Sequence, residues 1–201
     1  MTTLEKLEEL ILRNEKEAAK EAVRRKQEFD QQVKEGDHRF EIHRREMYTE
    51  FYDMIKMLGM FAESMVHPST IPIFAERGLV LTEVSARISA RRNGGTMEID
   101  VLGAGPEAVV AIEAKSRLLT EDVKDYLKRL PKFFEYFPRF NGLTLYGAVA
   151  GLSVDPSAAR YAYKNGLFVL EPAAYLVQIW NDESFIPRTF GGPEKKRTRR
   201  T

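Results

Sequence analysis

The chain has 201 residues, of which 43% are apolar and 30% charged, with a formal net charge of +1 and no cysteine. This composition is typical of one globular domain with some additional chain. The lack of cysteine excludes disulfides, zinc–thiolate sites, iron–sulfur clusters and thiol catalysis. It also fits a cytoplasmic, reducing compartment. No apolar run approaches the ~20 residues that a membrane helix needs, so we expect no membrane partner. A near-neutral charge neither indicates nor excludes nucleic acid.

The first 50 residues hold eleven Lys/Arg, thirteen Asp/Glu, no proline and one glycine, Gly36. This pattern predicts a charged helical arm over residues 1–50. Apolar residues at seven-residue spacing favour a coiled coil, and hence a homodimer or higher homo-oligomer. Polar residues interrupt this seam, so a solvated single helix and a partner-binding arm remain alternatives. The seam contains Leu4, Leu7, Ile11 and Ala18 and, after a one-residue slip, Val33, Phe40, Met47, Met54 and Phe61.

A second, more apolar helix is predicted from Phe51 to about Arg77. We expect Pro68 and Pro72 to kink or divide it, because proline lacks the N–H that the helix needs. Gly78 then supplies the stop signal. From this point the apolar residues follow the period of strands rather than helices.

The rest of the chain alternates between predicted strands and helices. The expected order is helix, three strands, helix, strand, helix, strand, which indicates an α/β fold with a mixed β-sheet flanked by helices, in a domain of residues 51–190. Residues 175–181 add a further strand or a cap, and residues 191–201 are expected to be a disordered basic tail. The predicted strands are 79–91, 97–102, 108–116, 143–152 and 167–170, the predicted helices are 120–137 and 155–166, and Asn93-Gly94-Gly95 is a hairpin turn.

The second hairpin contains the most informative residues. Gly105-Pro106-Glu107-Ala108 has proline at the second position of a predicted β-turn. A turn centred between Pro106 and Glu107 makes residues whose numbers sum to 213 face each other. Because side chains alternate along a strand, one face of the sheet should carry the pairs Leu102–Ala111, Asp100–Glu113 and Glu98–Lys115, and the other should carry Ile99, Val101, Ile112 and Ala114.

Two carboxylates directly opposite each other would have Cβ atoms about 4.5–5.5 Å apart and would repel. A Mg²⁺ ion bound by Asp100 and Glu113 relieves this repulsion, because Mg²⁺ prefers oxygen ligands. Lys115 lies two residues further along the same face, where it could orient or deprotonate a water on the ion. Such a set is suited to hydrolysis of a phosphodiester. The alternative is a solvated ladder, with Lys115 paired to Glu98 and Glu113 and no metal bound.

Ile99-Asp100, followed after a short hairpin by Glu113-Ala114-Lys115, resembles the motif of the PD-(D/E)XK nuclease superfamily. In this chain Ile99 replaces the proline of the motif. The long charged helix before the motif is similar to that of uncharacterised bacterial and archaeal proteins that join a coiled coil to a PD-(D/E)XK-like domain. The resemblance covers about residues 58–171 and implies a restriction-endonuclease-like αβββαβ core.

The resemblance also implies roles for individual residues. Asp100 and Glu113 would bind Mg²⁺ or Mn²⁺, Ala114 would offer its carbonyl oxygen, and Lys115 would assist the attacking water. Glu63, on the preceding helix, matches a glutamate that often completes the site through a metal-bound water. From the pattern alone, Glu63 could equally be an acidic residue on the wet side of an amphipathic helix.

We therefore expect a metal-dependent nuclease that hydrolyses DNA phosphodiester bonds through a metal-activated water. The alternative is a non-catalytic nuclease-fold scaffold that binds a protein or nucleic acid through its helical arm and basic surface. Phosphate contacts could come from Arg87, Arg91 and Arg92 on the first hairpin, and from Lys124, Lys128, Arg129 and Lys132 on the following helix, whose default role is a solvated face. An aromatic cluster is expected to pack on the sheet, with base stacking as its alternative role; its members are Phe133, Phe134, Tyr136, Phe137 and Phe140.

Overall fold

The computed structural model describes residues 3–174 and 176–191, apart from the side chains of residues 3–9 and 176. The predicted basic tail lies outside this range except for Gly191, as do the side chains of the seam residues Leu4 and Leu7. The chain divides into two compact units, Met1–Met54 and Ile55–Thr201. In the described part of the chain, no helix combines the length and apolar character needed to cross a membrane.

One helix, α1 (Thr3–Ala75), spans the first unit and enters the second. Pro68 and Pro72 both lie inside it. Of the two expectations for these prolines, a kink or a division, the division of the helix is wrong. The buried side chains of Val66 and Phe74 pack in the same core, and such tertiary packing outweighs the lost backbone hydrogen bonds. Gly78 ends the turn after α1 with a φ of +74°, as predicted.

The second unit is built on a six-stranded mixed sheet in the order β1-β2-β3-β4-β5-β6. Its β3–β4 and β4–β5 pairs are parallel, and the other neighbours are antiparallel. The predicted mixed α/β architecture is therefore confirmed, and residues 176–179 form a strand rather than a cap. The strands are β1 (Glu83–Arg92), β2 (Gly95–Ala104), β3 (Ala108–Leu118), β4 (Thr144–Val154), β5 (Phe168–Ala173) and β6 (Leu176–Ile179).

Two cores lie on opposite faces of this sheet. One is closed by the last part of α1, from Ala62 to Phe74, and the other by the helices that follow β3 and β4. The predicted helix 120–137 is interrupted at Leu130-Pro131, because Pro131 cannot donate the next helical hydrogen bond. The covering helices are α2 (Thr120–Arg129), η1 (Leu130–Lys132), α3 (Phe133–Tyr136), η2 (Pro138–Phe140) and α4 (Pro156–Lys164).

The register of β2 and β3 is the predicted one. The paired residues run from Ala104–Val109 to Val101–Ile112, and each pair sums to 213. Gly105 in the connecting turn has no room for a side chain, since a Cβ there would lie 1.9 Å from the carbonyl oxygen of Val80. This close approach explains why glycine precedes Pro106.

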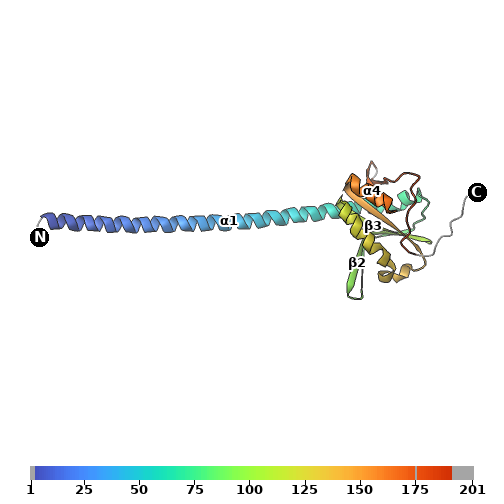
Figure 1. Ribbon diagram of the computed structural model, residues 1–201, viewed down its shortest axis with the longest axis horizontal. Coiled ribbons are helices and arrows are strands. Elements are labelled where there is room, and N and C mark those ends of the chain that lie inside the picture. Colours follow the sequence, from blue (N-terminus) through green and yellow to red (C-terminus); the bar gives the residue numbers. More distant parts are fainter. Residues whose placement is uncertain (1–2, 175, 192–201) are drawn as a thin grey trace, which may run out of the picture. The chain divides into compact units, whose positions relative to one another are not determined.

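The expected face of Ile99 is wrong. Ile99 packs in the same core as Leu102, whereas Val101 packs in the core on the other face. Arg87, which lies opposite Asp100 in the β1–β2 register, has a φ of +51°. The regular alternation of side chains is therefore lost at the level of the hairpin where this left-handed residue lies. Figure 1 shows the green β1–β2 hairpin extending past the other strands.

Candidate active site

Asp100 and the Glu113-Ala114-Lys115 segment meet where the β2–β3 ladder ends. The last described pair of this ladder is Val101–Ile112. At the next position, the Asp100 carboxylate accepts a hydrogen bond of 2.8 Å from the backbone N–H of Ala114. This contact holds an acidic side chain of β2 against the backbone of β3.

Glu113 is held by two cations. It is only 6% exposed, and its Oε1 lies 2.7 Å from Nζ of Lys115. Its Oε2 lies 2.6 Å from Nη2 of Arg129, the last residue of α2. The ladder alternative anticipated the pair with Lys115, but the sequence did not indicate Arg129 as a partner of Glu113. The only feature of the sequence that could have pointed to Arg129 is its position in the basic last turn of α2.

Arg129 connects several parts of the site. Its Nη1 lies 3.4 Å from the carbonyl oxygen of Glu98, to which it donates, and its guanidinium lies 5.5 Å from the ring centroid of Tyr126. Tyr126 is buried, and its hydroxyl donates a hydrogen bond of 2.7 Å to the carbonyl oxygen of Ala111. Burial, together with the negative charge of Glu113, raises the pKa of Tyr126 well above its usual value. Tyr126 is therefore a neutral hydrogen-bond donor that supports β3.

The surroundings of the site raise the pKa values of Asp100 and Lys115. Burial, and then repulsion from Glu113, raise the pKa of Asp100 to about 6, against the opposing effects of the Ala114 N–H and Lys115. For Lys115, burial disfavours the ammonium, but the hydrogen bond to Glu113 and its negative charge outweigh burial and raise the pKa. Lys115 is thus a cation at neutral pH, suited to orienting a ligand rather than to accepting a proton.

Glu63 comes near the site but is paired elsewhere. Its side chain is 16% exposed, and both of its carboxylate oxygens accept from Arg87, at 2.6 and 3.0 Å. The negative charge of Glu63 contributes to the raised pKa of Asp100. The structure therefore brings Glu63 into electrostatic range of Asp100, while Arg87 occupies its oxygens.

The donor set can be compared with the needs of a divalent cation. Among the described residues, no group of three or more His, Cys, Asp or Glu side chains is placed to hold a metal ion. Two carboxylates and the carbonyl of Ala114 are nevertheless the oxygen donors that Mg²⁺ and Mn²⁺ accept. The raised pKa of Asp100 also reflects negative charge that a cation would offset. The chemistry of the residues fits such an ion.

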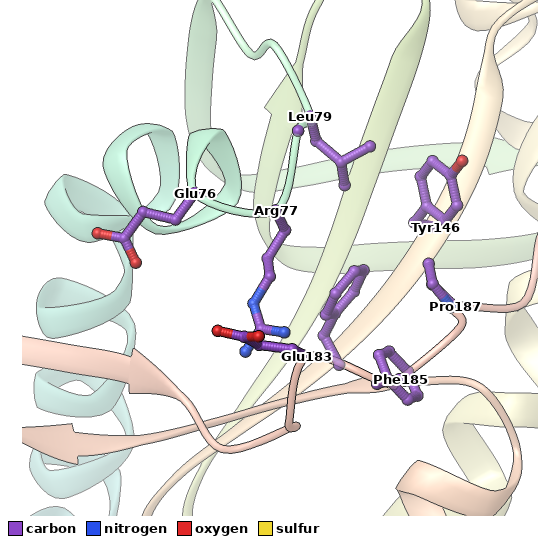
Figure 2. Close-up of a pocket in the computed structure, with 9 residues that line it drawn as sticks. Glu76, Arg77, Leu79, Tyr146, Glu183, Phe185 and Pro187 are labelled. Carbon is purple, nitrogen blue, oxygen red and sulfur yellow. The ribbon is translucent and has the colours of Figure 1, made fainter.

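A cavity of about 660 Å³ lies at a different place in the second unit (Figure 2). Its lining includes Arg77, Tyr146, Phe168 and Phe185, and none of the predicted site residues. The guanidinium of Arg77 donates to the carbonyl oxygens of Asn181 and Asp182. Arg77 therefore ties the segment after β6 to the end of α1.

Comparison with known proteins yields little. No protein-family model and no curated protein matches this chain. A solved structure, "Protein of Unknown Function AF1548", is similar over 57% of this chain and 58% of its own, with 17% sequence identity and a TM-score of 0.38. The chain thus matches less than two thirds of that protein. The chain itself forms an α/β domain with a mixed six-stranded sheet and a long N-terminal helix.

Proposed function

We propose that this protein is a metal-dependent nuclease of the PD-(D/E)XK type, with a restriction-endonuclease-like core, that hydrolyses DNA phosphodiester bonds. The observation that carries the proposal is the meeting of Asp100, Glu113 and Lys115 at the end of the β2–β3 ladder. Two carboxylates beside an ammonium can serve a cation and an anionic substrate at one place.

Each residue has a distinct task in this proposal. Asp100 and Glu113 would hold Mg²⁺ or Mn²⁺ together with the carbonyl oxygen of Ala114, and the bound ion would supply Lewis-acid stabilisation of charge on the phosphate. Lys115, as an ammonium, would donate hydrogen bonds that position the attacking water. Arg129 would keep the Glu113 carboxylate in its orientation. Glu63 could reach the ion through water only by releasing Arg87.

The second candidate is a non-catalytic nuclease-fold scaffold that binds a protein or nucleic acid. It is favoured by the pairing of both Glu113 oxygens with Lys115 and Arg129, and of both Glu63 oxygens with Arg87. Carboxylates that are satisfied in this way can stabilise a fold without a metal. Under this candidate the cluster is a salt-bridge network.

A cleavage assay on plasmid and single-stranded DNA separates the two candidates. We expect cleavage with Mg²⁺ or Mn²⁺, none with EDTA, and a loss of about 100-fold or more for Asp100→Ala and Lys115→Ala. Lys164→Ala, which removes an exposed lysine from α4, should cleave like the wild type. Cleavage that survives both site substitutions would indicate a contaminant. No cleavage, with no heat of Mg²⁺ or Mn²⁺ binding in calorimetry, would favour the scaffold.

We also propose that the chain forms a homodimer or higher homo-oligomer through its N-terminal helix. In the first unit, the seam residues Val33, Phe40 and Met47 are 46%, 67% and 56% exposed. Burial of such residues against a second copy would be favourable by ~25 cal/mol per Å² of apolar surface. Two paired subunits would also place two active sites on one DNA duplex.

A further inference from the structure

A groove of about 410 Å³ lies between the first hairpin and the segment that follows α2. One side is formed by residues 88–90 and Arg92 of β1, and the other by residues 136–139. Its lining has two arginines, Arg92 and Arg139, and two aromatic residues, Tyr136 and Phe137. None of the residues that line it is acidic. The groove therefore combines positive charge with aromatic surface.

The walls of this groove are firmly supported. Phe137 is buried, with its ring centroid 5.1 Å from that of Phe133. The hydroxyl of Tyr136 lies against the hairpin, since a Cβ on Gly95 would be 2.4 Å from it. The turn at the end of the hairpin has left-handed residues at Asn93 and Gly94, which is the conformation of a tight type I′ turn. These contacts fix the spacing between the two walls.

The two arginines are free to meet a ligand at the surface. Both are exposed, and the guanidinium of Arg139 lies 4.8 Å from the ring centroid of Phe140. Carboxylates do occur nearby, because Glu98 is opposite Ser89 in the hairpin register and Glu135 precedes Tyr136. An anionic ligand would therefore be held by the arginines rather than by the whole rim.

We propose that this groove binds a single strand of nucleic acid, with Arg92 and Arg139 paired to phosphates and a base in contact with the ring of Tyr136. Arginine matches phosphate geometry, and an aromatic ring accepts any unpaired base. The inference rests on the proposed nuclease function, and it assigns a path to the substrate. It favours an unpaired strand because bases within a duplex are already stacked on each other.

The path would lead from the groove to the candidate active site. The hairpin connects the two, because Ser89 of the groove is paired with Glu98. The carbonyl oxygen of Glu98 accepts from Arg129, which also pairs with Glu113 of the site. The five residue-to-residue steps from Arg87 to Arg92 span about 17 Å in an extended strand. This length corresponds to about five nucleotides at the spacing of one strand in duplex DNA. A strand lying in the groove would therefore approach Asp100 along β1.

Binding of a fluorescein-labelled twelve-nucleotide thymidine oligomer, measured by fluorescence anisotropy in EDTA over a range of salt concentrations, tests this inference. We expect Arg92→Gln and Arg139→Gln each to reduce the slope of log K against log salt by about 0.7, and the double variant to bind about 10-fold more weakly or worse. Tyr136→Leu should weaken binding about 5-fold or more without changing the slope. Arg160→Gln, which removes an exposed arginine from α4, is the matched control and should bind like the wild type.

The inference is overturned if the wild type fails to bind the oligomer, or if the double variant binds like Arg160→Gln. Equal affinity for a duplex of the same length would overturn the preference for an unpaired strand. Unchanged Trp180 fluorescence and far-ultraviolet circular dichroism confirm that each variant is folded. Because binding is measured without metal, it is independent of cleavage. Binding without cleavage in Mg²⁺ or Mn²⁺ would contradict the nuclease alone, whereas cleavage unaffected in the double variant would contradict the groove alone.

Discussion

Replacing Asp100 with asparagine should stabilise the second unit at neutral pH in metal-free buffer. Asparagine has nearly the same shape as aspartate, and its side-chain oxygen can still accept from the N–H of Ala114, as the carboxylate does at 2.8 Å. The substitution removes only the negative charge, which burial and Glu113 both disfavour. Asp100, which would help to bind a cation, is thus expected to reduce the stability of the metal-free protein.

The magnitude follows from the pKa of Asp100, which is raised from 3.8 to about 6. Between these pH values the folded chain binds more protons than the unfolded chain, so the stability of the wild type falls as the pH rises through this window. A shift of about 2 pH units at about 1.4 kcal/mol per unit sets an upper limit of about 3 kcal/mol. Partial exposure of Asp100 lowers the expected gain for Asp100→Asn at pH 7 to about 1–3 kcal/mol.

Urea unfolding followed by the fluorescence of Trp180 measures this effect. Trp180 is the single tryptophan of the chain, and its ring centroid lies 6.1 Å from that of Tyr163 in the second unit. The difference between variant and wild type should be close to zero at pH 4 and largest at pH 7 or above. Added Mg²⁺ should stabilise the wild type by about 2.7 kcal/mol at a concentration 100 times its dissociation constant, and the variant by less.

Two results would refute this reasoning. If Asp100→Asn is no more stable than the wild type at pH 7 in EDTA, the charge of Asp100 is not disfavoured in the folded chain. If the variant is more stable by the same amount at pH 4 and pH 7, the gain does not arise from ionisation of Asp100. Lys164→Ala, far along the chain on α4, serves as the control for general effects of pH on variants.

Two further predictions concern Glu113 and the N-terminal helix. Arg129→Met should destabilise the second unit by about 1–3 kcal/mol at pH 7. The reason is that Glu113, whose side chain is 8% exposed, would keep only the ion pair with Lys115. An unchanged urea midpoint would contradict this role for Arg129. Deletion of residues 1–50 should reduce the molar mass measured by light scattering, while the Trp180 unfolding curve of the remaining chain stays the same. The number of chains per particle is the measured molar mass divided by the mass of one chain. If the shortened protein has the same number of chains per particle as the full-length protein, self-association through this segment is ruled out.

Much of the architecture could be predicted from local patterns. The change of apolar period after Gly78 indicated the strands, and the turn at Pro106 predicted the register from Val101–Ile112 to Ala104–Val109. These features depend on residues that are close in sequence, where periodicity and turn chemistry act directly. Within the site, the same register correctly brought Asp100 close to the Glu113-Ala114-Lys115 segment.

Other features depended on contacts between distant segments. The uninterrupted course of α1 past Pro68 and Pro72 reflects packing against the sheet, which a count of helix breakers does not include. The face of Ile99 differs from the predicted one where β2 runs beside Arg87 of β1, which has a left-handed conformation that is unusual for arginine. The break at Pro131 is different, because it arises from the missing N–H of proline, a local feature that the apolar pattern did not take into account.

The sequence by itself determined the order of helices and strands, the mixed sheet and the β2–β3 register, because each follows from periodicity and turn residues within a few positions. Only the tertiary structure decided the partners of the charged side chains: Arg129 for Glu113 and Arg87 for Glu63. The physical reason is that the sequence offers each charged residue many possible partners of opposite charge. Packing of the two cores places just one or two of them within the few ångströms over which an ion pair forms.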